Sequence, residues 1–263
     1  MEIPLTDRRP TCAIIPGHMI KIAALVCLYA CTAQATTIIV QKTTKHIVVA
    51  ADSLFTSQDL TPIRFGCKLR RANNIYFTGS ERTMGAQQAL RIAWESMLGS
   101  RSASQAARKF GLRSQEMADR AKFYYPREVK ECLGGHICGE FLFFEVEHGV
   151  PKLTTVKMEF AGTFESFILV PHTFDCPGTC LDTEKVSFCM GVCAGITPES
   201  FKTGLPDTDT ARKLVSREEQ LAPQLVGGPI DVLTLDASGA HWELTQGGTC
   251  SPDEDPKPHQ KPH

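Results

Sequence analysis

After residue 35, the chain alternates between short runs of β-branched and apolar residues and clusters of turn-forming residues. Such runs are typical of strands, and the clusters between them are typical of tight turns. Thr43-Thr44-Lys45, Asn73-Asn74 and Asp236-Ala237-Ser238-Gly239 are the clearest turns. The pattern predicts strands over residues 36–42, 46–51, 68–72, 75–78, 140–147, 152–158, 186–192, 229–235 and 240–244.

Three other segments show helical periodicity. The first begins at Ser80 and carries its apolar residues mostly on one face. The second begins at Ser102, which forms a capping-box pattern with Gln105, and the third covers residues 207–221. Strands, two helices, strands, one helix and strands follow in that order. This order predicts an α+β fold in which two antiparallel sheets pack together and helices cover their outer faces.

An export-type segment lies at the N-terminus. Lys21 precedes an apolar stretch, residues 22–30, and Ala33-Gln34-Ala35 is the small-x-small pattern that signal peptidase cuts. We therefore predict a signal peptide over residues 1–35, with Met19 as its most natural start and the residues before Met19 as an N-terminal extension. Cleavage after Ala35 predicts a periplasmic or secreted protein.

A competing processing site ends at Cys31. Leu28-Tyr29-Ala30-Cys31 approximates a bacterial lipobox, although Tyr29 is large for its position. Acylation of Cys31 would anchor the protein and would leave Thr36 inside the chain. No later segment approaches the roughly 20 apolar residues of a membrane helix, so no stable membrane span is expected.

The composition is that of a globular domain. The chain has 263 residues, of which 42% are hydrophobic and 22% charged, and its net charge is −1. This charge gives no sign of a basic surface, so no nucleic-acid partner is expected. We expect one domain over residues 36–247, followed by a disordered tail over residues 248–263, which are rich in Pro, Lys and His without periodicity.

Cysteine usage agrees with export. The predicted mature chain keeps an even number of cysteines, and in an oxidising compartment these are expected to form disulfides of unknown connectivity. The alternative is a four-thiolate zinc site made by Cys176, Cys180, Cys189 and Cys193, whose spacing is loose for zinc. The eight are Cys67, Cys132, Cys138, Cys176, Cys180, Cys189, Cys193 and Cys250.

Cleavage after Ala35 would make Thr36 the first residue of a strand. A threonine with a free α-amine carries a nucleophilic hydroxyl and a base on the same residue. Asp52 follows Thr36 by 16 positions, and Lys68 follows Asp52 by another 16. Taken singly, these residues suit a strand, a turn and a solvated surface, so the catalytic interpretation rests on their combination.

These residues carry a family resemblance. Thr36-Thr37-Ile38-Ile39-Val40, the segment from Ile47 to Ser53, and Lys68 together resemble the start of proteasome-type β-subunits. That family belongs to the N-terminal nucleophile (Ntn) hydrolases, whose fold is a four-layer αββα sandwich of two antiparallel sheets flanked by helices. Its catalytic threonine, aspartate and lysine stand at the same intervals, and residues 227–232 resemble its closing Gly-Gly strand.

The resemblance implies a role for each residue. Thr36 would be the nucleophile, Lys68 would lower the pKa of its α-amine, and Asp52 would keep Lys68 charged and oriented. Gly79 would donate its backbone amide to the oxyanion. No cofactor and no metal are implied.

The resemblance is incomplete around the α-amine. The family places a supporting aspartate and serine just before Gly227-Gly228, where this chain has Pro223 and Val226. Replacement by Thr163, Ser187 or Ser200 is left open.

The function expected from these residues is that of an exported threonine-nucleophile amidohydrolase acting on a peptide or another amide. Homo-oligomer formation is left open. The alternative is a catalytically inactive envelope protein of the same fold, with a binding or structural role and an acylated Cys31.

Overall fold

The computed structural model divides the chain into two units, Met1–Ala33 and Gln34–His263, and every residue described here belongs to the second. The predicted signal peptide, with Met19 and Cys31, lies outside the described residues. Within those residues, no helix is long and apolar enough to cross a membrane. The described residues are 36–56, 62–81, 86–124, 126–133, 137–176, 186–201, 207–243 and 250.

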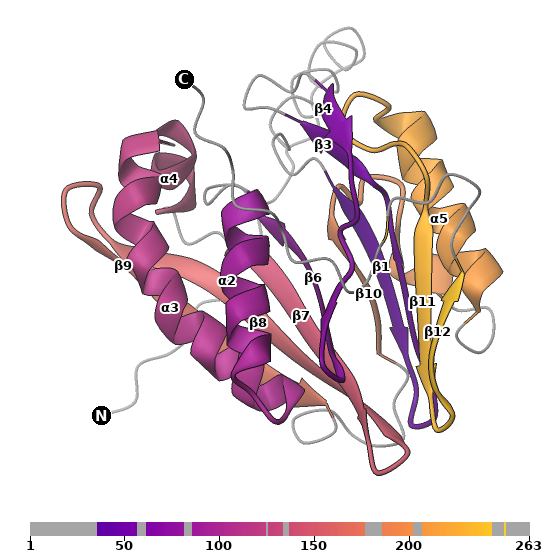
Figure 1. Cartoon of the computed structure of the whole chain (residues 1–263). Helices are drawn as coiled ribbons and strands as arrows, with labels where there is room; N and C mark the ends of the chain where they lie inside the picture. The colour runs from indigo at the N-terminus through magenta and orange to yellow at the C-terminus, as the bar shows by residue number, and fades with distance from the viewer. Residues whose placement is uncertain are drawn as a thin grey trace, which may run out of the picture. The chain divides into compact units, whose positions relative to one another are not determined.

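Two five-stranded antiparallel sheets form the centre of this unit (Figure 1). In the first sheet the order is β10-β1-β2-β11-β12, and in the second it is β5-β6-β7-β8-β9. The first sheet consists of β1 (Thr37–Lys42), β2 (Ile47–Ala51), β10 (Val186–Gly191), β11 (Asp231–Asp236) and β12 (Gly239–Glu243). The second consists of β5 (Arg70–Ala72), β6 (Ile75–Glu81), β7 (Ile137–Glu147), β8 (Val150–Gly162) and β9 (Phe167–Cys176).

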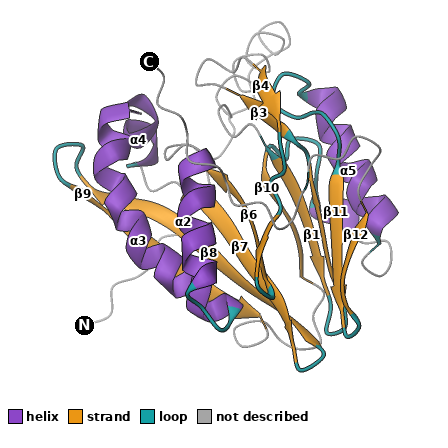
Figure 2. Ribbon diagram, viewed as in Figure 1, coloured by secondary structure: helices purple, strands orange, loops and turns teal. Residues whose placement is uncertain are grey.

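Helices cover the outer face of each sheet, as Figure 2 shows by element type. The second sheet carries α2 (Ala86–Leu98), α3 (Ala103–Tyr124) and α4 (Pro126–Cys132), and the first carries α5 (Thr208–Leu221). A short hairpin of β3 (Leu54–Thr56) and β4 (Pro62–Phe65), and a 3₁₀ turn, η1 (Pro198–Phe201), complete the described elements.

Strand β1 shows how the layers form. All six of its residues are buried, because successive side chains point to opposite faces of the sheet and both faces are covered. Ile38 and Val40 pack toward the second sheet, in a cluster with Leu142 and Phe144, whereas Ile39 packs toward α5. A further cluster, centred on phenylalanines of β6, β7 and α3, fills the space between the second sheet and its helices. The expected four-layer αββα sandwich is therefore confirmed.

Capping side chains close to the first residue determine where two of the helices begin. Gln105 N–H donates to Ser102 Oγ (3.2 Å), and the side chain of Gln105 accepts from the Arg101 amide (2.8 Å), so the predicted capping box forms with its return bond shifted by one residue. At α5 the Asp207 carboxylate accepts from the Asp209 and Thr210 amides. These bonds satisfy amides that lack a partner within the helix.

Two expectations about secondary structure were wrong. Ser80 does not begin a helix: it lies in β6, which continues to Glu81 because it pairs with β7 as far as Gly139, and α2 begins only at Ala86. No strand was predicted over residues 167–176, but these residues form the edge strand β9. The predicted tail lies outside the described residues except for Cys250, whose side chain is buried.

Three disulfides occur among the described residues. Cys67 is bonded to Cys250, Cys132 to Cys138, and Cys189 to Cys193. Cys189 and Cys193 are therefore not available as two of the four thiolates of the alternative zinc site.

Candidate active site

Asp52 lies directly after β2 and collects hydrogen bonds from four donors. Its Oδ1 accepts from the Thr37 amide and from Lys68 Nζ, both at 2.8 Å. Its Oδ2 accepts from the amides of Leu54 (3.2 Å) and Gly227 (3.3 Å). The strand end thus places one carboxylate where β1, β3 and the segment before β11 meet.

Asp52 and Lys68 form a buried ion pair, with only 1% of Asp52 and 4% of Lys68 exposed. Burial raises the pKa of Asp52, against the lowering effect of Lys68 and of the Thr37 and Gly227 amides. Burial also lowers the pKa of Lys68, against the raising effect of Asp52. Burial therefore brings the proton affinities of the two groups closer together, and buried groups with shifted pKa values are often found at functional sites.

Thr36 lies immediately before β1 and is half-buried. Its carbonyl oxygen accepts a hydrogen bond from Val192 N–H at 2.7 Å. The next residue, Thr37, donates its amide to Asp52, and its Oγ1 donates to the Val192 carbonyl at 2.7 Å. The two residues at this end of β1 are thus held by the Asp52–Lys68 pair and by Val192.

Gly79 lies in β6 opposite Phe141. A Cβ at this position would lie 2.4 Å from the Phe141 ring, so the glycine is required by packing on the helix side of the sheet. The neighbouring Ser80 has the opposite orientation, because strand residues alternate. Both the Ser80 hydroxyl (3.0 Å) and the Thr36 carbonyl oxygen (1.9 Å) lie close to the point that a Cβ of Gly191 would occupy. Strand β6 therefore approaches Thr36 at this point.

The three residues left open as support for the α-amine lie in different parts of the fold. Thr163 and Ser200 take part in local turns, through bonds to Ser166 and Thr197. Ser187 pairs with Gln41, four positions along β1 from Thr37. Four residues of a strand span about 13 Å, so Ser187 does not lie at the Thr36 end of the strand.

Sequence reasoning missed three contributors around Thr36, namely Ser80, Gly191 and Val192. Val192 acts through its backbone, which no side-chain pattern reveals. Gly191 has φ = +86°, a conformation that favours glycine. The closely spaced cysteines at 189 and 193 were the available signal that this segment is a tight loop.

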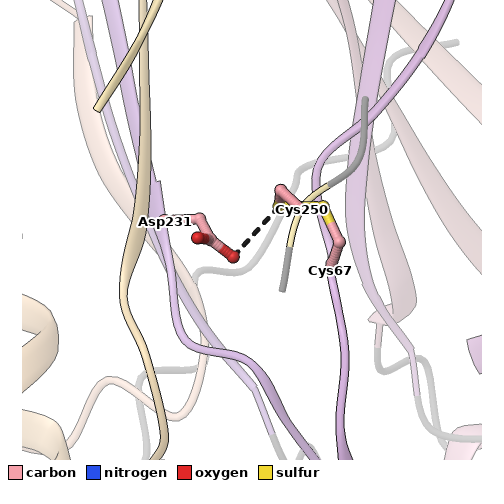
Figure 3. A group of neighbouring side chains, drawn as sticks. All are labelled: Cys67, Asp231 and Cys250. Carbon is pink, nitrogen blue, oxygen red and sulfur yellow. Dashed lines mark hydrogen bonds between the residues drawn. A yellow bond between two sulfur atoms is a disulfide. The ribbon is translucent and has the colours of Figure 1, made fainter. Parts of the chain in front are cut away.

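A further cluster of potential metal ligands occurs among the described residues. The ligand atoms of Cys67, Asp231 and Cys250 lie within 4.8 Å of one another (Figure 3), and Asp231 Oδ2 lies 3.0 Å from Cys250 Sγ. Because Cys67 and Cys250 form a disulfide, neither sulfur is the thiolate that a metal requires. This donor set does not fit a metal ion.

Comparison with known proteins gives a remote likeness only. No family model matches the sequence, and no curated protein matches it. Among solved structures, the Anbu (Gly-1) mutant from Hyphomicrobium sp. strain MC1 is 15% identical over 80% of this chain and 84% of that one, with a TM-score of 0.49. This likeness extends to the fold at most and transfers no activity to the chain.

Proposed function

We propose that the chain is an exported Ntn hydrolase of proteasome β-like type that cleaves peptide or other amide bonds with Thr36 as nucleophile. The observation that carries the proposal is the buried Asp52–Lys68 pair. Its carboxylate accepts a hydrogen bond from the amide of Thr37, the residue directly after Thr36. A buried ion pair costs desolvation energy, so its position beside a threonine at the start of a strand favours a chemical role.

The reaction begins after the Ala35–Thr36 bond has been cut. The Thr36 α-amine takes the proton of Thr36 Oγ, and this oxygen attacks the carbonyl carbon of the amide. The tetrahedral intermediate collapses, the leaving amine takes the proton from the α-ammonium, and an ester to Thr36 remains. Water then attacks the ester with the α-amine as base, and the carboxylic acid is released while Thr36 Oγ regains its proton.

Lys68 and Asp52 support the base. The ordinary pKa of an α-amine is about 7.7–8.0, and a nearby ammonium lowers it toward neutral pH. Asp52 fixes Lys68 in place through the 2.8 Å hydrogen bond. In this proposal the Gly79 amide stabilises the oxyanion, a contribution of about 2.7–4 kcal/mol in known cases.

The first test is the mass of the mature protein. We expect a chain that begins at Thr36, produced by export to the periplasm or the medium. A chain that begins at an acylated Cys31 would remove the nucleophile and support the inactive envelope protein instead.

The second test is substitution of the nucleophile. Thr36→Ala should abolish hydrolysis of fluorogenic peptide amides and covalent labelling by a β-lactone. Thr37→Ser is the matched control, because it keeps the hydroxyl that donates to Val192. Undiminished turnover by the Thr36→Ala protein would refute the mechanism.

A further inference from the structure

The segment Cys189–Gly195, here called the clamp loop, holds the residue proposed as nucleophile. Val192 N–H donates to the Thr36 carbonyl, and the Val192 carbonyl accepts from Thr37 Oγ1, both at 2.7 Å. A single loop residue therefore fixes two consecutive residues at the start of β1.

Gly191 allows the loop to come this close. Its φ is +86°, and a Cβ there would lie 1.9 Å from the Thr36 carbonyl oxygen. Real Cβ atoms do not approach so closely, so any other residue would push the loop away from Thr36.

The clamp loop is held by a disulfide and, at its last residue, by a hydrogen bond. The Cys189–Cys193 disulfide spans Gly191 and Val192, just where the pairing of β10 with β1 ends at Thr37. Beyond the disulfide, the Gly195 amide donates to Glu218 Oε1 at 2.7 Å, and Glu218 is fully buried in α5. The loop is therefore tied to the first sheet through β10 and to the helix that covers this sheet.

The position of Thr36 matters more than that of an ordinary nucleophile. Its hydroxyl and its base belong to one residue, which has no chain on its amino side once the preceding bond is cut. A displacement of about 1 Å can cost about 100-fold in rate. The hold on its carbonyl oxygen therefore helps to set the geometry of both reacting groups.

We infer that the Cys189–Cys193 disulfide makes the clamp loop a positioning element for Thr36, so that hydrolysis depends on this disulfide being oxidised. The inference rests on the proposed function. Reduction by a dithiol would transfer two electrons and two protons, giving two cysteine thiols and the oxidised dithiol, and would free the loop. Both cysteines are half-buried rather than sealed in the core.

The test compares two disulfides that close similarly short loops. Cys189–Cys193 has a sequence separation of 4, and Cys132–Cys138, which joins α4 to β7, has a separation of 6. We expect Cys189→Ala/Cys193→Ala to lower kcat about 10- to 100-fold while KM changes less than about threefold. The control, Cys132→Ala/Cys138→Ala, should keep kcat and KM.

A second measurement does not depend on activity. In a Thr36→Ala background, amide hydrogen exchange of Val192 should become faster when Cys189 and Cys193 are replaced, and should not change when Cys132 and Cys138 are replaced. If the wild-type enzyme is inactive, the proposed function fails, and exchange alone still tests the hold on Thr36.

Two results would overturn the inference. The first is unchanged kcat or unchanged Val192 exchange after loss of Cys189–Cys193. The second is an equal fall of kcat in both double variants, which would indicate general loosening of the fold. Near-ultraviolet circular dichroism establishes that each variant is folded before it is assayed.

Discussion

The Cys67–Cys250 disulfide is expected to contribute more to stability than the other two. It joins residues 183 positions apart and thus closes a loop that contains nearly the whole described unit, whereas Cys132–Cys138 spans a separation of 6. In the chain-entropy description, a cross-link stabilises the folded state by restricting the unfolded chain, and the effect grows with the logarithm of the loop length. The ratio of the two loop lengths corresponds to a difference of about 3 kcal/mol.

The perturbation is the pair of double variants Cys67→Ala/Cys250→Ala and Cys132→Ala/Cys138→Ala. All four cysteines are buried, so the loss of side-chain packing is similar in the two variants and cancels in the comparison. The remaining difference in the free energy of unfolding comes from the lengths of the two loops.

The assay is urea unfolding followed by circular dichroism, without reductant and after thiol titration has shown the other disulfides to be intact. We expect the Cys67–Cys250 variant to lose about 3 kcal/mol more of unfolding free energy than the Cys132–Cys138 variant. Equal losses, or a larger loss in the Cys132–Cys138 variant, would refute the loop-length reasoning for this protein.

Three further predictions concern charge and backbone. Lys68→Met should lower the free energy of unfolding by about 3–5 kcal/mol, because it leaves the Asp52 carboxylate buried without its cation. A double-mutant cycle with Asp52→Asn should show coupling between the two substitutions, and strictly additive losses would contradict this. Burial raises the pKa of Glu218, so its contribution to stability is complete below the ordinary carboxyl value of about 4.3 and is lost as the pH rises through the folded-state value. Glu218→Gln should therefore raise the urea midpoint relative to wild type more at pH 7 than at pH 4, and an equal change at both would refute the assignment. Gly228→Ala should lose more stability than Gly239→Ala in thermal unfolding. Both glycines have positive φ, so backbone strain is common to the two variants, but only at Gly228 would the new Cβ collide with neighbouring atoms, at 2.4 and 2.6 Å. Equal losses would show that backbone strain alone matters.

The fold could be predicted where one segment carries its own signal. The predicted strands at 36–42 and 46–51 agree with β1 and β2 to within one residue, because β-branched side chains are buried on both faces there. Strand β9 was missed because Pro171 lies within it, and an edge strand tolerates a proline that a central strand would not. Ser80 was assigned to a helix because pairing with β7, which decides its structure, is not encoded nearby.

Part of the candidate site could also be predicted from the sequence, and part could not. The family resemblance predicted that Asp52 would hold Lys68, and the structure joins the two side chains by a 2.8 Å hydrogen bond. The contribution of Val192 could not be predicted, because a valine side chain gives no sign that its peptide group binds two threonines. The roles of Thr36, Asp52, Lys68 and Gly79 in catalysis stay predictions.

The four donors around Asp52 also bear on how the protein reaches its folded state. They come from Thr37, Leu54, Lys68 and Gly227, and the last is 175 positions away along the chain. Until the segment before β11 has docked, the carboxylate lacks one of its partners in a dry environment, which is unfavourable. We therefore expect Asp52 and Lys68 to reach their final arrangement only after this segment has docked. If Thr36 is the nucleophile, as proposed, a partly folded chain would not yet hold Lys68 where it supports the α-amine, and hydrolysis would begin only when the fold is complete.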